Sequence, residues 1–473
     1  MNSHSGLTQA GPLGPVSVFA AGFLLLAAPL MRGGNRHLAL MTLEAIGTII
    51  MLSIALRSIL RQGDMSAAKP RWGAAQWLLL SSPALLALIY LVPMPVAMWA
   101  QAAGRDVYLQ AMRNAGATIP GSMPLSVVPD ATLTSLLAGI PLVAAFLLGQ
   151  GCTVAQLRWL ARAVVFAAAV QVLIGLLQLS GGENSPFLFG FAATRPIGTF
   201  ANSNHLANYL AGALVLYIWL AWEALVPQED TRRGAPGGSR DGRRFVALWV
   251  GGGLVLVVGI LMTRSRGAVL TGLPVAALAA GWLLARGRSK HLGWRRVVPA
   301  LAIVLLATIS FLGVDVVLSR FAAVEFNQSA SFRSLLTLTT LAGAAEFWPW
   351  GAGWGVYGAV YPRFQPPEIP GTAGYAHQDY VQMLFEGGVF ALVFAGAFVW
   401  LVARRIVLFA RLVRRKHRLR RESVAAALCG LGLLGFLAHS LVEFNMHIPA
   451  NAILASLLAG VFLRPLADAG DAP

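Results

Sequence analysis

Stretches of about 20 apolar residues recur along almost the whole 473-residue chain. Each is long enough to cross the ~30 Å hydrocarbon core of a bilayer. In lipid it must be helical, because only a helix satisfies its own backbone hydrogen bonds there. The sequence therefore predicts an all-α integral membrane protein. We predict about twelve spans: 14–31, 38–57, 75–93, 131–149, 160–179, 204–223, 245–262, 267–285, 297–314, 381–403, 423–442 and 446–463.

The composition excludes a soluble domain. Hydrophobic residues make up 57% of the chain and charged residues only 12%, whereas soluble domains have about 25% charged residues. The net charge of +17 does not indicate a nucleic-acid partner, because the basic residues lie in short blocks between the apolar stretches, as the positive-inside rule expects. Cys152 and Cys429 lie in separate apolar parts of the chain, which favours buried thiols over a redox pair.

The distribution of basic residues predicts the orientation. With a cytoplasmic N-terminus, 26 of the 36 Lys and Arg residues fall on the inner side, so we expect a multi-pass protein with both termini in the cytoplasm. Arg32 and Arg36 are local exceptions. The longest segment between spans, 315–380, then lies on the outer face, and loops of this length are usually functional.

Several arginines lie on the predicted outer side, where the positive-inside rule does not call for basic residues. Arg264 and Arg266 occupy a tight connection between two spans, and Arg195 precedes the sixth span on the same side. Guanidinium groups bind phosphate bidentately, so these residues are a candidate anion clamp. Snorkelling to lipid headgroups is the alternative. Near Arg195, Asn204 belongs to a polar group that either binds a ligand or caps and links helices.

His377 is the candidate general base, because an unperturbed imidazole titrates near neutral pH. It lies where the long outer loop meets the next span. Asp379 and Glu386 follow it and either orient it or begin the helix. His439, Glu443 and His447 lie around the last outer turn and either line a cavity or make interhelical contacts.

Five stretches, in this order, resemble the bacterial O-antigen ligases and the related O-antigen and exopolysaccharide polymerases. They are RPIGTF at 195–200 with Asn202, Asn204 and His205, RSRG at 264–267, the segment 333–357 ending in GAGWGVY, HQDYVQMLFEGG at 377–388, and HSLVEFN at 439–445. The twelve-span plan and the long loop before the tenth span match as well.

The resemblance implies an inverting glycosyltransferase of the bacterial inner membrane. It would transfer a preassembled glycan from a polyprenyl (undecaprenyl) diphosphate carrier on the periplasmic side, without a metal or another cofactor. Arg264 and Arg266, with Arg195, would hold the diphosphate, and His377 would deprotonate the acceptor hydroxyl. Arg333 would help the long loop to bind the acceptor. The family often has Asn after this histidine, where this chain has Gln378.

We divide the chain into 1–180, the first five spans, and 181–473, the ligase-like core that includes loop 315–380. The sequence does not identify the acceptor, which is either the lipid A core or another glycan. A ligase and a polymerase are therefore both compatible with the sequence. A transporter or flippase of a lipid-linked or anionic glycan is the main alternative function, and an inactive subunit of an export complex is a third. Neither a P-loop nor an HExxH motif occurs in the sequence, so nothing indicates ATP use or zinc hydrolysis.

Overall fold

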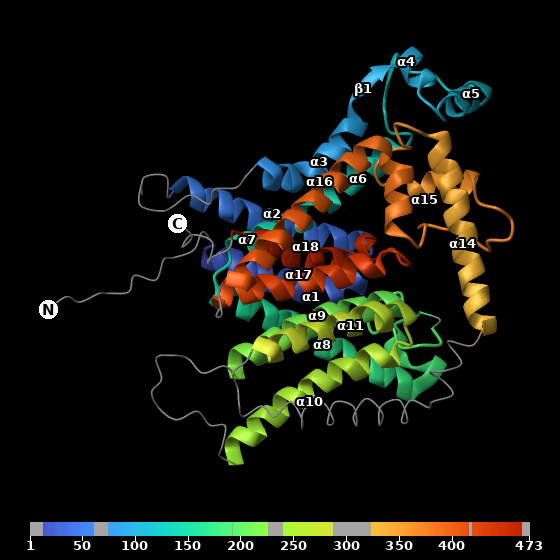
Figure 1. The fold of residues 1–473 in the computed structure, drawn as a ribbon. Helices are drawn as coiled ribbons and strands as arrows, with labels where there is room; N and C mark the ends of the chain where they lie inside the picture. Colours follow the sequence, from blue (N-terminus) through green and yellow to red (C-terminus); the bar gives the residue numbers. More distant parts are fainter. Residues whose placement is uncertain are drawn as a thin grey trace.

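The computed structural model describes residues 13–60, 74–191, 193–225, 240–286, 323–415 and 419–465. Within these ranges the protein is a bundle of apolar helices (Figure 1). The bundle helices are α1 (Pro15–Leu30), α2 (His37–Leu60), α3 (Ala74–Leu91), α6 (Pro129–Ala138), α7 (Ile140–Gly151), α8 (Val154–Gly181), α9 (Ser203–Leu225), α10 (Arg240–Met262), α11 (Arg266–Arg286), α16 (Asp379–Arg415), α17 (Arg421–His439) and α18 (Pro449–Leu463).

Seven helical segments of this part of the chain are long and apolar enough to span a membrane, and three shorter helices are also apolar. The all-α membrane class is therefore confirmed. The count of twelve spans stays a prediction, because the expected span 297–314 lies outside the described residues. The expected span 131–149 consists of two helices, α6 and α7, which meet at Gly139. Pro141 in the first turn of α7 lacks the N–H that a continuous helix would need there.

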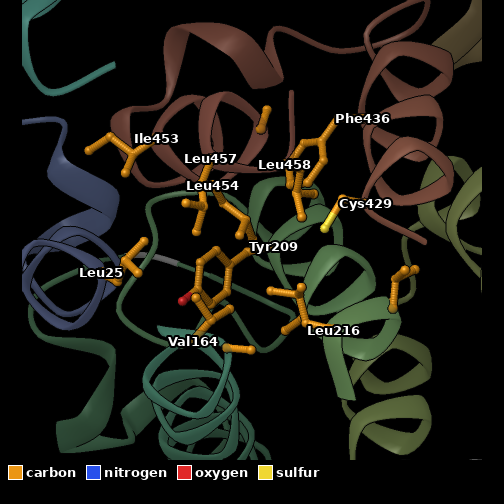
Figure 2. Packing of buried hydrophobic residues seen from close by; sticks show 14 of the residues in the cluster. Leu25, Val164, Tyr209, Leu216, Cys429, Phe436, Ile453, Leu454, Leu457 and Leu458 are labelled. Atoms are coloured by element: carbon orange, nitrogen blue, oxygen red, sulfur yellow. The ribbon is translucent and has the colours of Figure 1, made fainter. Parts of the chain in front are cut away.

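The core of the bundle lies around α9. In the 18-residue stretch of α9 that is apolar enough to span a membrane, 78% of the residues are buried. Tyr209 of α9 points between Val164 of α8 and Leu454 of α18 (Figure 2). Helices from both predicted parts of the chain contribute to this one apolar cluster, which includes Leu25 of α1. At the start of α8, Thr153 and Gln156 form a reciprocal capping box that satisfies two backbone N–H groups.

The described segments 92–128 and 323–378 lie together at one end of the bundle, which we call the loop end (Figure 1). There β1 (Pro93–Pro95) pairs with β2 (Ser122–Pro124), and the helices are α4 (Val96–Gln101), α5 (Asp106–Asn114), α14 (Ala323–Glu346) and α15 (Tyr357–Val360). Arg105 is fully buried and donates hydrogen bonds to the carbonyls of Leu125 (2.6 Å) and Gly351 (2.8 Å). It thereby ties two loops that are far apart in sequence into one folded unit with its own apolar cluster.

Candidate active site

Glu443 is the centre of a polar cluster at the loop end, in the turn that follows α17. Its side chain is only 1% exposed. The Oε1 atom accepts hydrogen bonds from Arg333 Nη2 and from Asn204 Nδ2, both at 2.5 Å. The Oε2 atom lies 3.3 Å from Nδ1 of His377. A single buried carboxylate therefore holds three side chains that come from α14, α9 and the loop before α16.

Local structure holds two of these three side chains, those of Asn204 and Arg333, in place. Asn204 lies in the first turn of α9, where its own N–H donates to Oδ1 of Asn202 at 2.8 Å, as in an Asx cap. Arg333 projects from α14 and also donates to the carbonyl of Val442 at 2.7 Å. This second bond fixes the guanidinium against the turn that carries Glu443.

The environment of Glu443 keeps its carboxylate ionised at neutral pH. Burial on its own would raise the pKa of Glu443, but the hydrogen bond with His377 and the positive charge of Arg333 outweigh it and lower the pKa to about 2. A carboxylate can only accept hydrogen bonds. The proton in the contact with His377 therefore lies on Nδ1 of the histidine.

His377 is held in a rare backbone conformation, with φ of 51°. Phe444 packs edge-on against its imidazole, with ring centroids 4.7 Å apart. The side chain remains 28% exposed. With a proton on Nδ1, the neutral ring carries its lone pair on Nε2. Among the described residues, Nε2 has no hydrogen-bond partner, so it is available to accept a proton.

His205 and His439 surround the same carboxylate and are both buried. Nε2 of His205 lies 3.8 Å from Oε2 of Glu443, and its ring packs on Phe444 with centroids 4.5 Å apart. His439 ends α17, and a Cβ on Gly267 would lie 2.2 Å from its Nε2 atom. The side chain of His439 therefore contacts the start of α11.

That contact brings the arginine turn, 262–267, next to the end of α17. Arg264 has a left-handed backbone (φ of 53°), Ser265 is buried, and the side chains of Arg264 and Arg266 are half-buried. Arg195 is half-buried as well and lies in the loop before α9. These three arginines are at the loop end, but none of them contacts Glu443 as Arg333 does.

Asp379 and Glu386 do not contact His377. Asp379 binds Nδ1 of His447 at 2.7 Å and the N–H of Met446 at 3.0 Å. Glu386 accepts the N–H groups of Gly355 and Tyr357, both at 3.0 Å. Both acids fasten loops around the site, and the pairing with Asp379 raises the pKa of His447 despite the opposing effect of its burial. The expected direct orientation of His377 by these two acids is therefore not observed, and Glu443 contacts Nδ1 instead.

Sequence reasoning left the role of Glu443 open and did not place it at the centre. The available signal was an acid inside the polar stretch HSLVEFN between two apolar spans, since ionisable residues at such depth are costly and usually functional. Gln382 was missed. It donates to Glu386 at 3.2 Å and contacts Nε2 of His447 at 3.0 Å, joining the two acids into one network.

Residues 251–396 match the family model of the O-antigen ligases. Over these residues the chain is similar to the O-antigen ligase domain. The resemblance inferred from the sequence motifs is therefore confirmed. The matched range of the O-antigen ligase domain contains Arg264, Arg266, Arg333 and His377, whereas Arg195, Asn204 and Glu443 lie outside it. None of the curated proteins matches the chain.

The O-antigen ligase domain and the apolar helices together show a multi-pass membrane protein whose family transfers glycans as a ligase or polymerase. Lipid-linked glycans are the substrates that this family implies. In the part of the chain that the structure describes, no group of three or more His, Cys, Asp or Glu side chains is arranged to hold a metal ion.

Proposed function

We propose that this protein is an inverting glycosyltransferase of the bacterial inner membrane. It transfers a preassembled glycan from a polyprenyl diphosphate carrier, such as undecaprenyl diphosphate, to an acceptor sugar on the periplasmic face. The acceptor is either the lipid A core or another glycan. The contact that supports this proposal most is the one between Nδ1 of His377 and the buried carboxylate of Glu443.

In this mechanism, His377 acts as the general base. Nε2 accepts the proton of the acceptor hydroxyl while the hydroxyl oxygen attacks the anomeric carbon of the donor. The bond between that carbon and the diphosphate oxygen breaks on the opposite face, and the electron pair leaves with the diphosphate. Glu443 stabilises the imidazolium that forms, because its negative charge already faces Nδ1. The configuration at the anomeric carbon inverts.

The leaving diphosphate needs positive charge, and Arg264, Arg266 and Arg195 are the residues we assign to it. Charge that develops on the diphosphate during bond cleavage is stabilised by fixed guanidinium groups without reorganisation. Arg266 is also the first residue of α11, where the partial positive charge of a helix N-terminus favours a nearby anion.

Replacing Arg266 with lysine is expected to weaken donor use although the charge is kept. Lysine lacks the planar fork that binds two phosphate oxygens at once, so we expect the KM for the lipid-linked donor to rise about tenfold. Steady-state kinetics with varied donor measure this. Arg113→Lys, an exposed arginine of α5, is the matched control. An unchanged KM for Arg266→Lys would indicate a headgroup contact instead.

Treatment with EDTA is expected to leave the transfer rate unchanged, because arginines supply the positive charge in this mechanism. The rate is compared before and after chelation, with and without added Mg²⁺. A loss of rate on chelation that Mg²⁺ restores would contradict the proposal.

Proteoliposomes with fluorescent lipid-linked glycan separate this function from that of a transporter. We expect the glycan to appear on an added acceptor, and His377→Ala to abolish that product. Movement of the labelled lipid between leaflets without transfer to any acceptor would overturn the proposal in favour of a flippase. The acceptor that becomes labelled distinguishes a ligase from a polymerase.

A further inference from the structure

Gln178 of α8 fastens the loop that carries Arg195. The side chain is buried, and its Oε1 atom accepts the N–H groups of Ile197 (2.8 Å) and Gly198 (2.9 Å). Its Nε2 atom donates to the carbonyls of Gly198 (2.6 Å) and Phe187 (2.8 Å). A glutamine amide has two donors and two acceptor positions, and all four are used here.

Gln171 of α8 holds the same loop two turns away. It is fully buried, and its amide accepts the N–H of Thr199 at 2.8 Å and donates to the hydroxyl of Thr199 at 2.7 Å. Gly198 has φ of 58°, and a Cβ at this position would lie 2.2 Å from Oε1 of Gln171. Only glycine lets the loop approach α8 this closely.

Gly175 lies between the two glutamines on the same face of α8, because residues four and seven apart share a helix face. A Cβ on Gly175 would lie 2.3 Å from Cε of Met262 and 3.5 Å from Cβ of Pro196. Met262 ends α10, two residues before Arg264, and Pro196 follows Arg195. The segments that carry these two arginines therefore meet on one face of α8.

We infer that Gln178, with Gln171 and Gly175, positions the arginines of the donor site. This inference rests on the proposed function, because it assumes that Arg195 and Arg264 bind the diphosphate. Gln178 does not touch the substrate in this account. It acts through the loop 195–200, whose N–H groups at three successive positions, 197 to 199, are bound by glutamine side chains of α8.

Gln178→Met tests the inference, because methionine matches the length of glutamine but forms no comparable hydrogen bonds. We expect the KM for the lipid-linked donor to rise about tenfold, since small displacements of positioning groups are costly. The kcat and the KM for the acceptor should change by less than about twofold. Gln150→Met is the matched control, because Gln150 lies at the end of α7, far from the loop 195–200, and its amide donates to the carbonyl of Gly460.

Two further variants separate a failure of the inference from a failure of the proposed function. Gln178→Glu keeps an oxygen that can accept the N–H groups of Ile197 and Gly198, so we expect it to recover part of the donor KM. It also replaces Gln178→Met if the methionine variant does not fold. Arg195→Ala is the reference variant, because it removes one of the guanidinium groups that we assign to the donor diphosphate. If Arg195→Ala raises the donor KM and the folded Gln178 variants do not, the inference is wrong and the proposed function stands. If Arg195→Ala has no effect either, Arg195 does not bind the diphosphate, and the inference fails, whereas the Arg266→Lys variant still tests the proposed function.

Discussion

Replacing His377 with alanine is expected to lower kcat for glycan transfer by about 10²–10⁴-fold, the usual contribution of a general base. The KM for the donor should change little, because His377 is assigned to the acceptor hydroxyl and the diphosphate is assigned to the arginines. The variant should fold normally, since the His377 side chain is partly exposed. Single-turnover rates in detergent or nanodiscs measure the effect on chemistry directly.

His37→Ala is the matched control for this prediction. His37 is an exposed histidine in the first turn of α2, so its removal should leave the rate unchanged. A His377→Ala variant that keeps more than about a tenth of the wild-type kcat would contradict its role as a base.

Glu443→Gln is expected to lower kcat by about 10²-fold although the side chain keeps its shape. Both carboxylate oxygens of Glu443 accept hydrogen bonds, Oε1 from Arg333 and Asn204 and Oε2 from His377. Glutamine has only one oxygen, so its amide NH₂ must face a donor on one side. If the NH₂ faces His377, the imidazole has to carry its proton on Nε2, which then cannot act as the base.

Loss of the buried charge should also weaken the turn itself, because Arg333 loses its ionic partner. A thermal melt therefore accompanies the kinetics, so that unfolded protein is not counted as inactive. Glu368→Gln, at an exposed position of the same loop as His377, should match the wild type in both measurements. Full activity in a folded Glu443→Gln variant would show that His377 is oriented without this carboxylate.

Much of the bundle was predictable because lipid imposes one rule on every span. A window of about 20 apolar residues must be a helix, and ten of the predicted spans coincide with apolar helices that the structure describes. The division of 131–149 into α6 and α7 could have been suspected from Pro141. Sequence patterns did not predict that the segment between the third and fourth expected spans contains α4, α5 and a strand pair, because Arg105 and a second apolar cluster fold it against a distant loop.

The residue types of the candidate site could be predicted from the sequence, but most of the contacts between their side chains could not. His377 and the arginines at positions 195, 264 and 266 are recognisable because their chemistry is unusual beside apolar spans. Glu443 was not, since its significance depends on the approach of Asn204, Arg333 and His377 from three other elements, and sequence spacing contains no such information. The same is true of Gln178, whose role depends on a loop that folds back on α8.

The stereochemistry of the product tests the central claim most directly. Purified protein is supplied with a polyprenyl diphosphate glycan of known anomeric configuration and with its acceptor, and the new linkage is assigned by NMR coupling constants. We predict transfer with inverted configuration, because the hydroxyl activated by His377 attacks the face opposite the diphosphate. A product with retained configuration, or the absence of any transfer product, would contradict the account.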